Sequence, residues 1–236
     1  MHKSEDTAAD VYGRALYDYF LNGKADNLYL NTSYGEVEEM PVDWFFRDEE
    51  DFPELEAQAL NAAFGKILDI GAGVGSHAIY LHEQGKNVDA LDLSPFCIEI
   101  MKQRGLSQVY HQSFWEPLPT KYNTLLLLMN GIGIVNNLEG LRKFLTQAKE
   151  WLLPGGQILF DSSDLSYLYD DIKLNQYPYK GEIQYQYQYR RQKGEWFSWL
   201  YVDQQTMSRF ASEAGWHMQI LTEDNNDQYL ARLVHP

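Results

Sequence analysis

Two aspartates and three alternating glycines have the spacing of a ligand-binding turn. Asp69 stands two residues before Gly71, and Gly73 and Gly75 follow; Asp92 lies at the end of the next apolar run. Glycine inside a regular element costs about 0.5–1 kcal/mol relative to alanine. Three of them together therefore indicate a sharp backbone turn with something packed closely against it.

The segments around this turn alternate between short apolar runs and amphipathic stretches. The expected strands are residues 66–71, 87–93, 107–113, 123–130 and 156–163, and the expected helices between them are 76–85, 95–105 and 138–156. Strand–helix alternation of this kind predicts a parallel, doubly wound α/β sheet with right-handed crossovers. In such sheets, ligands bind outside the carboxyl ends of the strands, where the glycine turn would lie.

The chemistry of Asp69 and Asp92 narrows the class of ligand that the turn could bind. A dinucleotide-binding turn has the spacing G-x-G-x-x-G, whereas this chain has G-x-G-x-G with Ser76 in place of the last glycine. Asp69 would be poorly placed beside a pyrophosphate but well placed to pair with a cationic amine. Asp92 can bind both hydroxyls of a ribose. An amine, a carboxylate and a ribose together describe an amino-acid nucleoside, with its carboxylate near the helix start at Ser76 and His77.

These runs resemble a known family. "ILDIGAGVGSHAIYL" and "VDALDLSP" look like motifs I and II of class I S-adenosylmethionine-dependent methyltransferases, and residues 61–163 are similar to the core of that family. The resemblance implies a Rossmann-like methyltransferase fold with a seven-stranded, mostly parallel sheet and an antiparallel C-terminal edge strand. It also implies S-adenosyl-L-methionine as cofactor and S-adenosyl-L-homocysteine as product.

The same resemblance assigns expected roles to individual residues. Gly71, Ala72, Gly73 and Gly75 would pass under the methionine portion, with Asp69 near its amine; Asp92 would hold the ribose and Leu93 would pack on the adenine. Many members carry an acid after the third strand, where this chain has Ser113 and Phe114, whose backbone groups and ring face are expected to substitute. Asn130 either lines the methyl-transfer face or caps a strand end.

No catalytic residue follows from the sequence, because methyl transfer depends mainly on alignment and needs a base only where the nucleophile carries a proton. His77 is interpreted as anion-facing or exposed and His111 as structural. Arg47 is a candidate anion-binding residue. We expect no metal, because the single cysteine, Cys97, gives no thiolate site.

Composition limits the partners. The formal net charge is −15, which disfavours nucleic acid and anionic membranes as partners. No apolar run approaches the roughly 20 residues of a membrane span, and the start of the chain lacks a signal-peptide pattern. We expect a cytoplasmic protein that acts on a small molecule; the oligomeric state stays open.

Outside the core, we expect a single methyltransferase domain over residues 1–236. Its parts would be an N-terminal helical cap with a loop over 30–46 (1–60), the cofactor-binding core (61–163), an inserted β-hairpin that roofs the site (164–203), and a C-terminal helix with edge strands (204–236). The hairpin carries an alternating run that ends in Tyr185, Tyr187 and Tyr189, and these tyrosines either line an aromatic pocket or are half-buried sheet residues.

The sequence alone is compatible with three functions. The first is methyl transfer to a small-molecule acceptor. The second is a nicotinamide-dependent oxidoreductase, against which the glycine spacing and Asp69 both argue. The third is a module that binds S-adenosylmethionine without catalysis.

Overall fold

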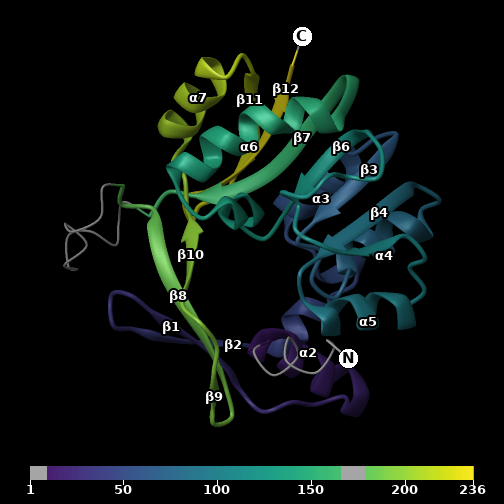
Figure 1. Ribbon diagram of the computed structural model, residues 1–236, viewed down its shortest axis with the longest axis vertical. Helices are drawn as coiled ribbons and strands as arrows, with labels where there is room; N and C mark the ends of the chain where they lie inside the picture. Colours follow the sequence, from purple (N-terminus) through teal and green to yellow (C-terminus); the bar gives the residue numbers. More distant parts are fainter. Residues whose placement is uncertain (1–9, 166–178, 236) are drawn as a thin grey trace.

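The computed structural model describes residues 10–165 and 179–235, and its centre is a seven-stranded sheet (Figure 1). The strand order is β11-β12-β7-β6-β3-β4-β5. In that order, the strands are His217–Glu223, Gln228–Val234, Leu152–Ser163, Tyr122–Leu127, Lys66–Ile70, Asn87–Asp92 and Val109–His111. Strands β7, β6, β3, β4 and β5 are parallel, and β12 pairs antiparallel with both β7 and β11. The predicted doubly wound sheet is confirmed, and its antiparallel strand lies one position inside the edge.

Helices cover both faces of this sheet. Apolar side chains of the parallel strands alternate between two core clusters, as a sheet buried on both faces requires. One cluster packs on α6 (Leu138–Trp151) and α7 (Gln204–Glu213), and the other on α3 (Glu54–Ala62), α4 (Ser76–Glu83) and α5 (Pro95–Gln103). Helix α6 ends at Trp151, earlier than predicted, because β7 already begins at Leu152.

A second sheet lies apart from the main one (Figure 1). Its strand order is β10-β8-β1-β2, all antiparallel, with the short β9 also paired to β8. The strands are β1 Leu28–Thr32, β2 Val37–Met40, β8 Glu182–Tyr189, β9 Gln192–Lys193 and β10 Phe197–Leu200. The predicted hairpin is present in β8 and β10, although residues 166–178 of the predicted insertion lie outside the described residues.

The prediction of a loop over residues 30–46 is wrong. Residues 28–40 form the β1–β2 hairpin, which turns at the predicted residues around Gly35, and only then follow the short 3-10 helices η1 (Val42–Phe46) and η2 (Glu49–Asp51). Strand β1 is held in the middle of the sheet by β8, which is more than 150 residues away in the chain. That distant pairing, rather than a local apolar pattern, makes the segment extended.

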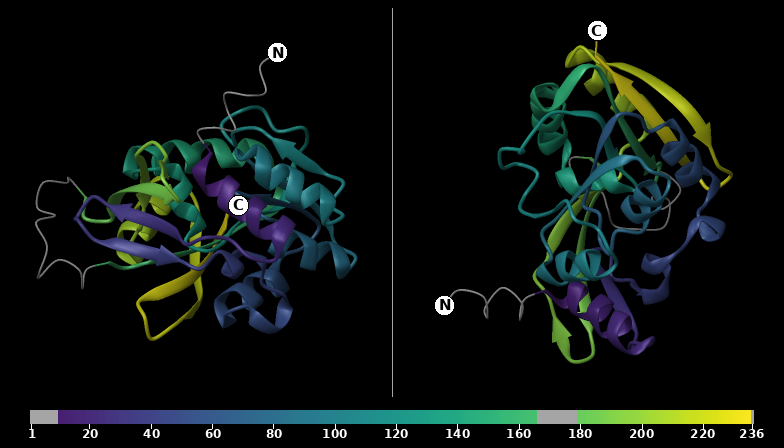
Figure 2. Two further views of the ribbon diagram at one scale, coloured as in Figure 1. Left: turned by 90° about the horizontal axis from the view of Figure 1, so that it is seen from below. Right: turned by 90° about the vertical axis from the view of Figure 1, so that its right-hand side faces the viewer.

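The N-terminal helix α2 (Val11–Asn22) is capped at both ends. The Asp10 carboxylate accepts a hydrogen bond from the Gly13 N–H at 2.7 Å, and Gly23 ends the helix with φ +66°. The helix contacts both α5 and β8, and Figure 2 shows it beside the second sheet. No helix within the described residues is long and apolar enough to cross a membrane.

Candidate functional site

A cavity of about 190 Å³ lies between the two sheets, at the carboxyl ends of β3 and β6. Its floor is the glycine turn after β3 and the turn after β6. One side is the segment around η1, and the roof is the inner face of the second sheet. Every wall thus comes from a different part of the chain.

The glycine turn contributes both to the cavity and to the packing of a helix. Gly71 and Gly73 both have positive φ and line the cavity, and the N–H groups of Gly71 and Ala72 donate to the carbonyl of Leu91, which ties the turn to β4. Gly75 lies outside the cavity lining, and a Cβ there would lie 2.7 Å from the Met101 side chain. The first two glycines therefore shape the cavity, and Gly75 allows α5 to pack closely.

Asp69 is a buried acid with an unsatisfied oxygen at the cavity wall. Its side chain lies on β3 and is 2 % exposed, and its Oδ2 atom has no hydrogen-bond partner among the described residues. Burial raises the pKa of Asp69 to about 6, against the opposing charge of His77. A buried carboxylate oxygen without a partner is costly, so a cation that enters the cavity here would be stabilised.

Asp92 is the last residue of β4, and its side chain links that strand to the glycine turn after β3. Its carboxylate accepts hydrogen bonds from the N–H groups of Gly73 and Ser94, each at 2.8 Å. Burial raises the pKa of Asp92 to about 6, although both hydrogen bonds lower it. The next residue, Leu93, is 61 % exposed and so presents a free apolar side chain beside this acid.

The predicted adenine contacts after β5 are arranged differently from the expectation. Ser113 is partly exposed, but the Phe114 ring is buried among Trp115, Phe144 and Trp151. The Phe114 ring is thus not available to stack on a ligand, and only its backbone could contribute. His111 is exposed and bonds to the Leu93 carbonyl through Nε2 at 2.8 Å.

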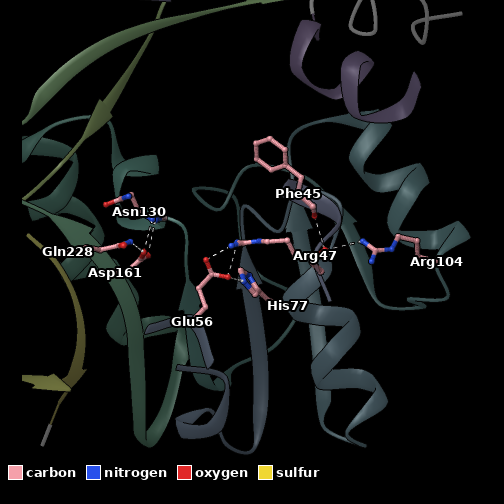
Figure 3. Close-up of polar contacts among 10 residues, drawn as sticks. Phe45, Arg47, Glu56, His77, Arg104, Asn130, Asp161 and Gln228 are labelled. Carbon is pink, nitrogen blue, oxygen red and sulfur yellow. Dashed lines mark hydrogen bonds and ion pairs between the residues drawn. The ribbon is translucent and has the colours of Figure 1, made fainter. Parts of the chain in front are cut away.

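Asn130 lies in a strained turn at the end of β6. Met129 and Asn130 both have positive φ, +64° and +53°, which non-glycine residues adopt at a cost of order 1–3 kcal/mol. The buried Asp161 carboxylate holds this turn by accepting from the Asn130 N–H at 2.9 Å (Figure 3). The Asn130 side chain itself bonds to Ser163, while Met129 and Gly131 line the cavity. The residues beside Asn130, rather than its own side chain, therefore face the cavity.

A buried ion cluster that the sequence did not reveal forms one side wall. Glu56 accepts two hydrogen bonds from an Arg47 nitrogen, at 2.8 and 2.9 Å, and its Oε2 atom lies 2.7 Å from His77 Nε2 (Figure 3). All three side chains are about one-tenth exposed or less. His77 is thus paired inside the protein, so the interpretation as an exposed residue is wrong. Arg47 and His77 line the cavity, as the anion-binding role expected for Arg47 requires.

Arg47 is positioned by the start of α4. The Ser76 hydroxyl donates to the Phe45 carbonyl at 2.7 Å and receives a hydrogen bond from Arg104 (Figure 3). This anchors η1 over the first turn of α4, where unpaired N–H groups favour an anion. The positive end of the helix and the Arg47 guanidinium therefore lie on the same side of the cavity.

Comparison with known proteins decides the family. The profile of the family described as "Methyltransferase domain" matches residues 44–220, three-quarters of the chain. The chain belongs to the class I methyltransferases. The sequence prediction of that family is thereby confirmed.

Solved structures resemble this methyltransferase over most of its length. An S-adenosylmethionine-dependent methyltransferase from Bacteroides fragilis, crystallised with S-adenosyl-L-homocysteine, is 41 % identical, with a TM-score of 0.91 over 97 % of this chain and 96 % of that one. A sugar N-methyltransferase from a Streptoalloteichus species is 15 % identical, with a TM-score of 0.58 over 86 % of this chain and 96 % of that one, and it shares the fold.

A curated relative matches a shorter region. Demethylmenaquinone methyltransferase from Tropheryma whipplei is 28 % identical over 100 residues, which are 40 % of each chain. The match thus spans well under half the length of that relative.

The roof of the methyltransferase cavity is a continuous row of aromatic rings. Tyr12 of α2 stacks on Tyr187 of β8, with ring centroids 4.9 Å apart, and Tyr187 stacks on Phe197 of β10 at 5.0 Å. Phe197 and Trp199 make an edge-to-face contact, with ring centroids 6.3 Å apart. We call these four residues the aromatic wall; all four line the cavity.

Proposed function

We propose that the protein transfers the methyl group of S-adenosylmethionine to a small-molecule acceptor. The observation that carries this proposal is Asp69, which lies beside the glycine turn and has a buried carboxylate oxygen with no hydrogen-bond partner among the described residues. Such an oxygen needs a cation. The α-amino group of S-adenosylmethionine supplies one. The relative from Bacteroides fragilis, crystallised with the product of that cofactor, supports the same assignment.

The remaining groups are assigned to the other parts of this cofactor, although Asp92, Leu93, Ser113 and Phe114 lie outside the lining of the cavity. Arg47 and the start of α4 offer positive charge for the carboxylate, and the glycine turn, including Ala72, provides the surface beneath the methionine chain. The Asp92 carboxylate is proposed to accept the ribose hydroxyls. Leu93 would contact the adenine, with backbone groups of Ser113 and Phe114 at its edge, and the Asn130 turn would lie at the transfer face through Met129 and Gly131.

The cofactor supplies a methyl group that is already activated on a sulfonium. The chain's own task is to hold the acceptor in line with it and to exclude water, which can contribute on the order of 7–11 kcal/mol. The two sheets share the cavity that does this, which supports the proposal that residues 1–236 act as one domain. The net charge of −15 supports a small molecule rather than nucleic acid as acceptor, and the single cysteine supports a cytoplasmic location.

Calorimetry with S-adenosyl-L-homocysteine tests cofactor binding directly. We expect a one-to-one complex, and we expect Asp92→Ala to weaken it at least tenfold, because charge-assisted hydrogen bonds are worth about 1.5–3 kcal/mol. Glu99→Ala, on the exposed side of α5, is the control and should leave affinity unchanged. Binding of a nicotinamide dinucleotide instead would contradict the proposal, and tight cofactor binding without turnover on any acceptor would favour a non-catalytic module.

A further inference from the structure

The 3-10 helix η3 (Gly131–Val135) lies between the glycine turn and the roof of the cavity. The Cδ1 atom of Ile134 is 3.1 Å from the position of a Cβ on Gly71, so Ile134 contacts the floor on which the methionine chain of the cofactor is proposed to lie. The preceding residue, Gly133, packs against the indole of Trp199 in β10. Two consecutive residues of η3 therefore connect the proposed cofactor site with the roof.

The indole, rather than the backbone, requires a glycine at position 133. Unlike Gly71 and Gly73, Gly133 has no positive φ, so an alanine could adopt its backbone conformation. A Cβ at this position would, however, overlap the Nε1, Cδ1 and Cε2 atoms of Trp199. The close approach of Gly133 and Trp199 therefore fixes the distance between η3 and β10.

Trp199 also holds the strained turn that precedes η3. Its indole N–H donates to the Asn130 carbonyl at 3.1 Å. Two other polar groups of Asn130 are held from β7, because its N–H donates to Asp161 and its side-chain oxygen accepts from Ser163. Asn130 has φ +53°, which a non-glycine residue keeps only where its surroundings hold it. The roof and β7 thus hold this turn from two sides.

A second contact fastens the same end of the roof. The Glu182 carboxylate of β8 accepts a hydrogen bond from the Leu138 N–H at 2.9 Å, at the start of α6. Glu182 pairs with Leu200, the neighbour of Trp199, so both contacts lie at one end of the second sheet. The position of the roof over the turn after β6 is therefore fixed at this end.

We propose that Trp199 is a positioning residue that holds the acceptor in line with the cofactor. This inference rests on the proposed function and names a residue that serves it. Trp199, Met129 and Gly131 line the cavity while η3 contacts the glycine turn, so the roof and the proposed cofactor site keep one spacing. In-line attack on the methyl carbon depends on that spacing, because a misplacement of about 1 Å can cost about 100-fold in rate.

The indole N–H signal of Trp199 in an NMR spectrum tests this connection without an acceptor. The chain has six tryptophans, and the indole signal that is lost in Trp199→Phe belongs to Trp199. We expect S-adenosyl-L-homocysteine to shift this signal, and Ile134→Ala, which shortens the side chain that reaches Gly71, to reduce the shift. The signal of Trp196, which is 49 % exposed and outside the cavity lining, should stay in place. A Trp199 signal that stays in place when the ligand binds, or that moves equally in Ile134→Ala, would overturn the proposal.

A double-mutant cycle separates positioning from a general structural role. Trp199→Leu and Gly133→Ala should each lower kcat about tenfold and leave the affinity for S-adenosyl-L-homocysteine within about threefold, because both displace the roof and not the cofactor site. In the Trp199→Leu background the indole that the added methyl group would meet is gone, so Gly133→Ala should have little further effect on kcat. Trp196→Leu is the control and should leave kcat unchanged. Losses of kcat that simply add, or an equal loss of cofactor affinity, would contradict the proposal.

The turnover measurements need a probe acceptor. Phenethylamine, 2-phenylethanol and 3-phenylpropanoic acid differ in the end group, and the cycle uses the one from which the wild type releases S-adenosyl-L-homocysteine fastest. If none of the three is methylated, the indole signal decides alone. Failure to bind S-adenosyl-L-homocysteine at all would overturn the proposed function itself, whereas binding that leaves the Trp199 signal in place would overturn only the role of Trp199.

Discussion

The Nε2 atom of His77 lies 2.7 Å from Oε2 of Glu56, in a wall where both side chains are buried. This contact joins α3 to α4, and the same carboxylate also holds Arg47 from the segment around η1. Burial opposes ionisation of Glu56, but the hydrogen bond and charge of His77, together with Arg47, outweigh it, so the pKa of Glu56 is lowered. One carboxylate therefore connects three segments that border the cavity.

Glu56→Gln should destabilise the fold. The substitution keeps the shape but leaves the buried Arg47 without its counter-charge, and breaking a buried ion pair costs about 3–5 kcal/mol. We expect the free energy of unfolding in urea to fall by about 3 kcal/mol at pH 7. Because the pKa of Glu56 is below its ordinary value of 4.5, this difference should be fully present above that value and shrink as the pH falls through the folded pKa.

Glu54→Gln is the matched control for this measurement. It is the same substitution in the same helix, at an exposed position. We expect a change of less than about 0.5 kcal/mol. If both variants behaved alike, the Arg47–Glu56–His77 cluster would have no special role in stability.

Asp69 should make cofactor binding depend on pH. Its pKa in the free protein is raised to about 6 by burial, so the carboxyl is partly protonated at and below that pH. Pairing with a cationic amine favours the ionised form and must lower that pKa. Affinity for S-adenosyl-L-homocysteine should therefore increase as the pH rises through 6, with release of protons on binding at pH 6.

Calorimetry at pH 6, in two buffers that differ in ionisation enthalpy, measures the protons released. Asp92 also has a pKa raised to about 6, so we expect Asp69→Asn to reduce the release rather than abolish it, and to weaken binding at pH 7.5 at least tenfold. Equal proton release by the wild type and Asp69→Asn would remove Asp69 from the amine site.

The parallel core could be predicted because its signals are local. The glycines of the turn, Gly71, Gly73 and Gly75, indicate from their type alone a backbone with positive φ. The unbroken apolar run Leu125–Leu128 likewise indicates a strand that is buried on both faces. The second sheet could be predicted only in its β8–β10 half, where Tyr185 and Tyr187 alternate with glutamines. The other half, β1 and β2, is extended because of β8, and no short window of sequence contains both partners.

The side walls of the site could not be predicted from the sequence, for a different reason. Glu56 and Glu54 are both in the first turn of α3, and Glu54 is exposed, so nothing in the pattern indicates which of the two is buried. The ring of Phe114, which follows β5, was expected to face the ligand but is turned into the core. Its direction depends on packing against Phe144 and Trp151, which come from a helix farther along the chain.

Gly73→Ala should separate backbone strain from ligand contact. Gly73 has φ +56°, and a Cβ there would lie 3.3 Å from the Tyr12 hydroxyl, whereas Gly85 has φ +74° with nothing within 4 Å. Both alanine substitutions should lower the free energy of unfolding by about 1 kcal/mol or somewhat more, because both force a left-handed backbone.

Only Gly73→Ala should also affect the ligand. The added methyl group enters the cavity and disturbs the hydrogen bond from the Gly73 N–H to Asp92. We expect its affinity for S-adenosyl-L-homocysteine to fall at least tenfold in calorimetry, while Gly85→Ala binds like the wild type. A parallel loss of affinity in both variants would mean that general destabilisation, rather than a cavity contact, controls binding.

Asp161 should position the turn at the transfer face without touching a ligand. Its carboxylate is 1 % exposed, accepts from the Asn130 N–H at 2.9 Å and from Gln228 Nε2 at 2.6 Å, and so holds the strained Met129–Asn130 backbone in place (Figure 3). Asp161→Asn replaces one acceptor oxygen by a donor. We expect kcat for methyl transfer to fall about tenfold, because small misplacements of reacting groups are costly.

The division between kcat and cofactor affinity distinguishes positioning from a structural role. Affinity for S-adenosyl-L-homocysteine should stay within threefold of the wild type in Asp161→Asn, and the exposed Asp227→Asn should leave both quantities unchanged. Burial raises the pKa of Asp161 to about 6, so wild-type kcat should fall as the pH drops through 6 while that of Asp161→Asn loses this part of the pH dependence. Equal losses of kcat, cofactor affinity and stability in Asp161→Asn would instead mean that Asp161 supports the fold as a whole and has no separate role at the transfer face.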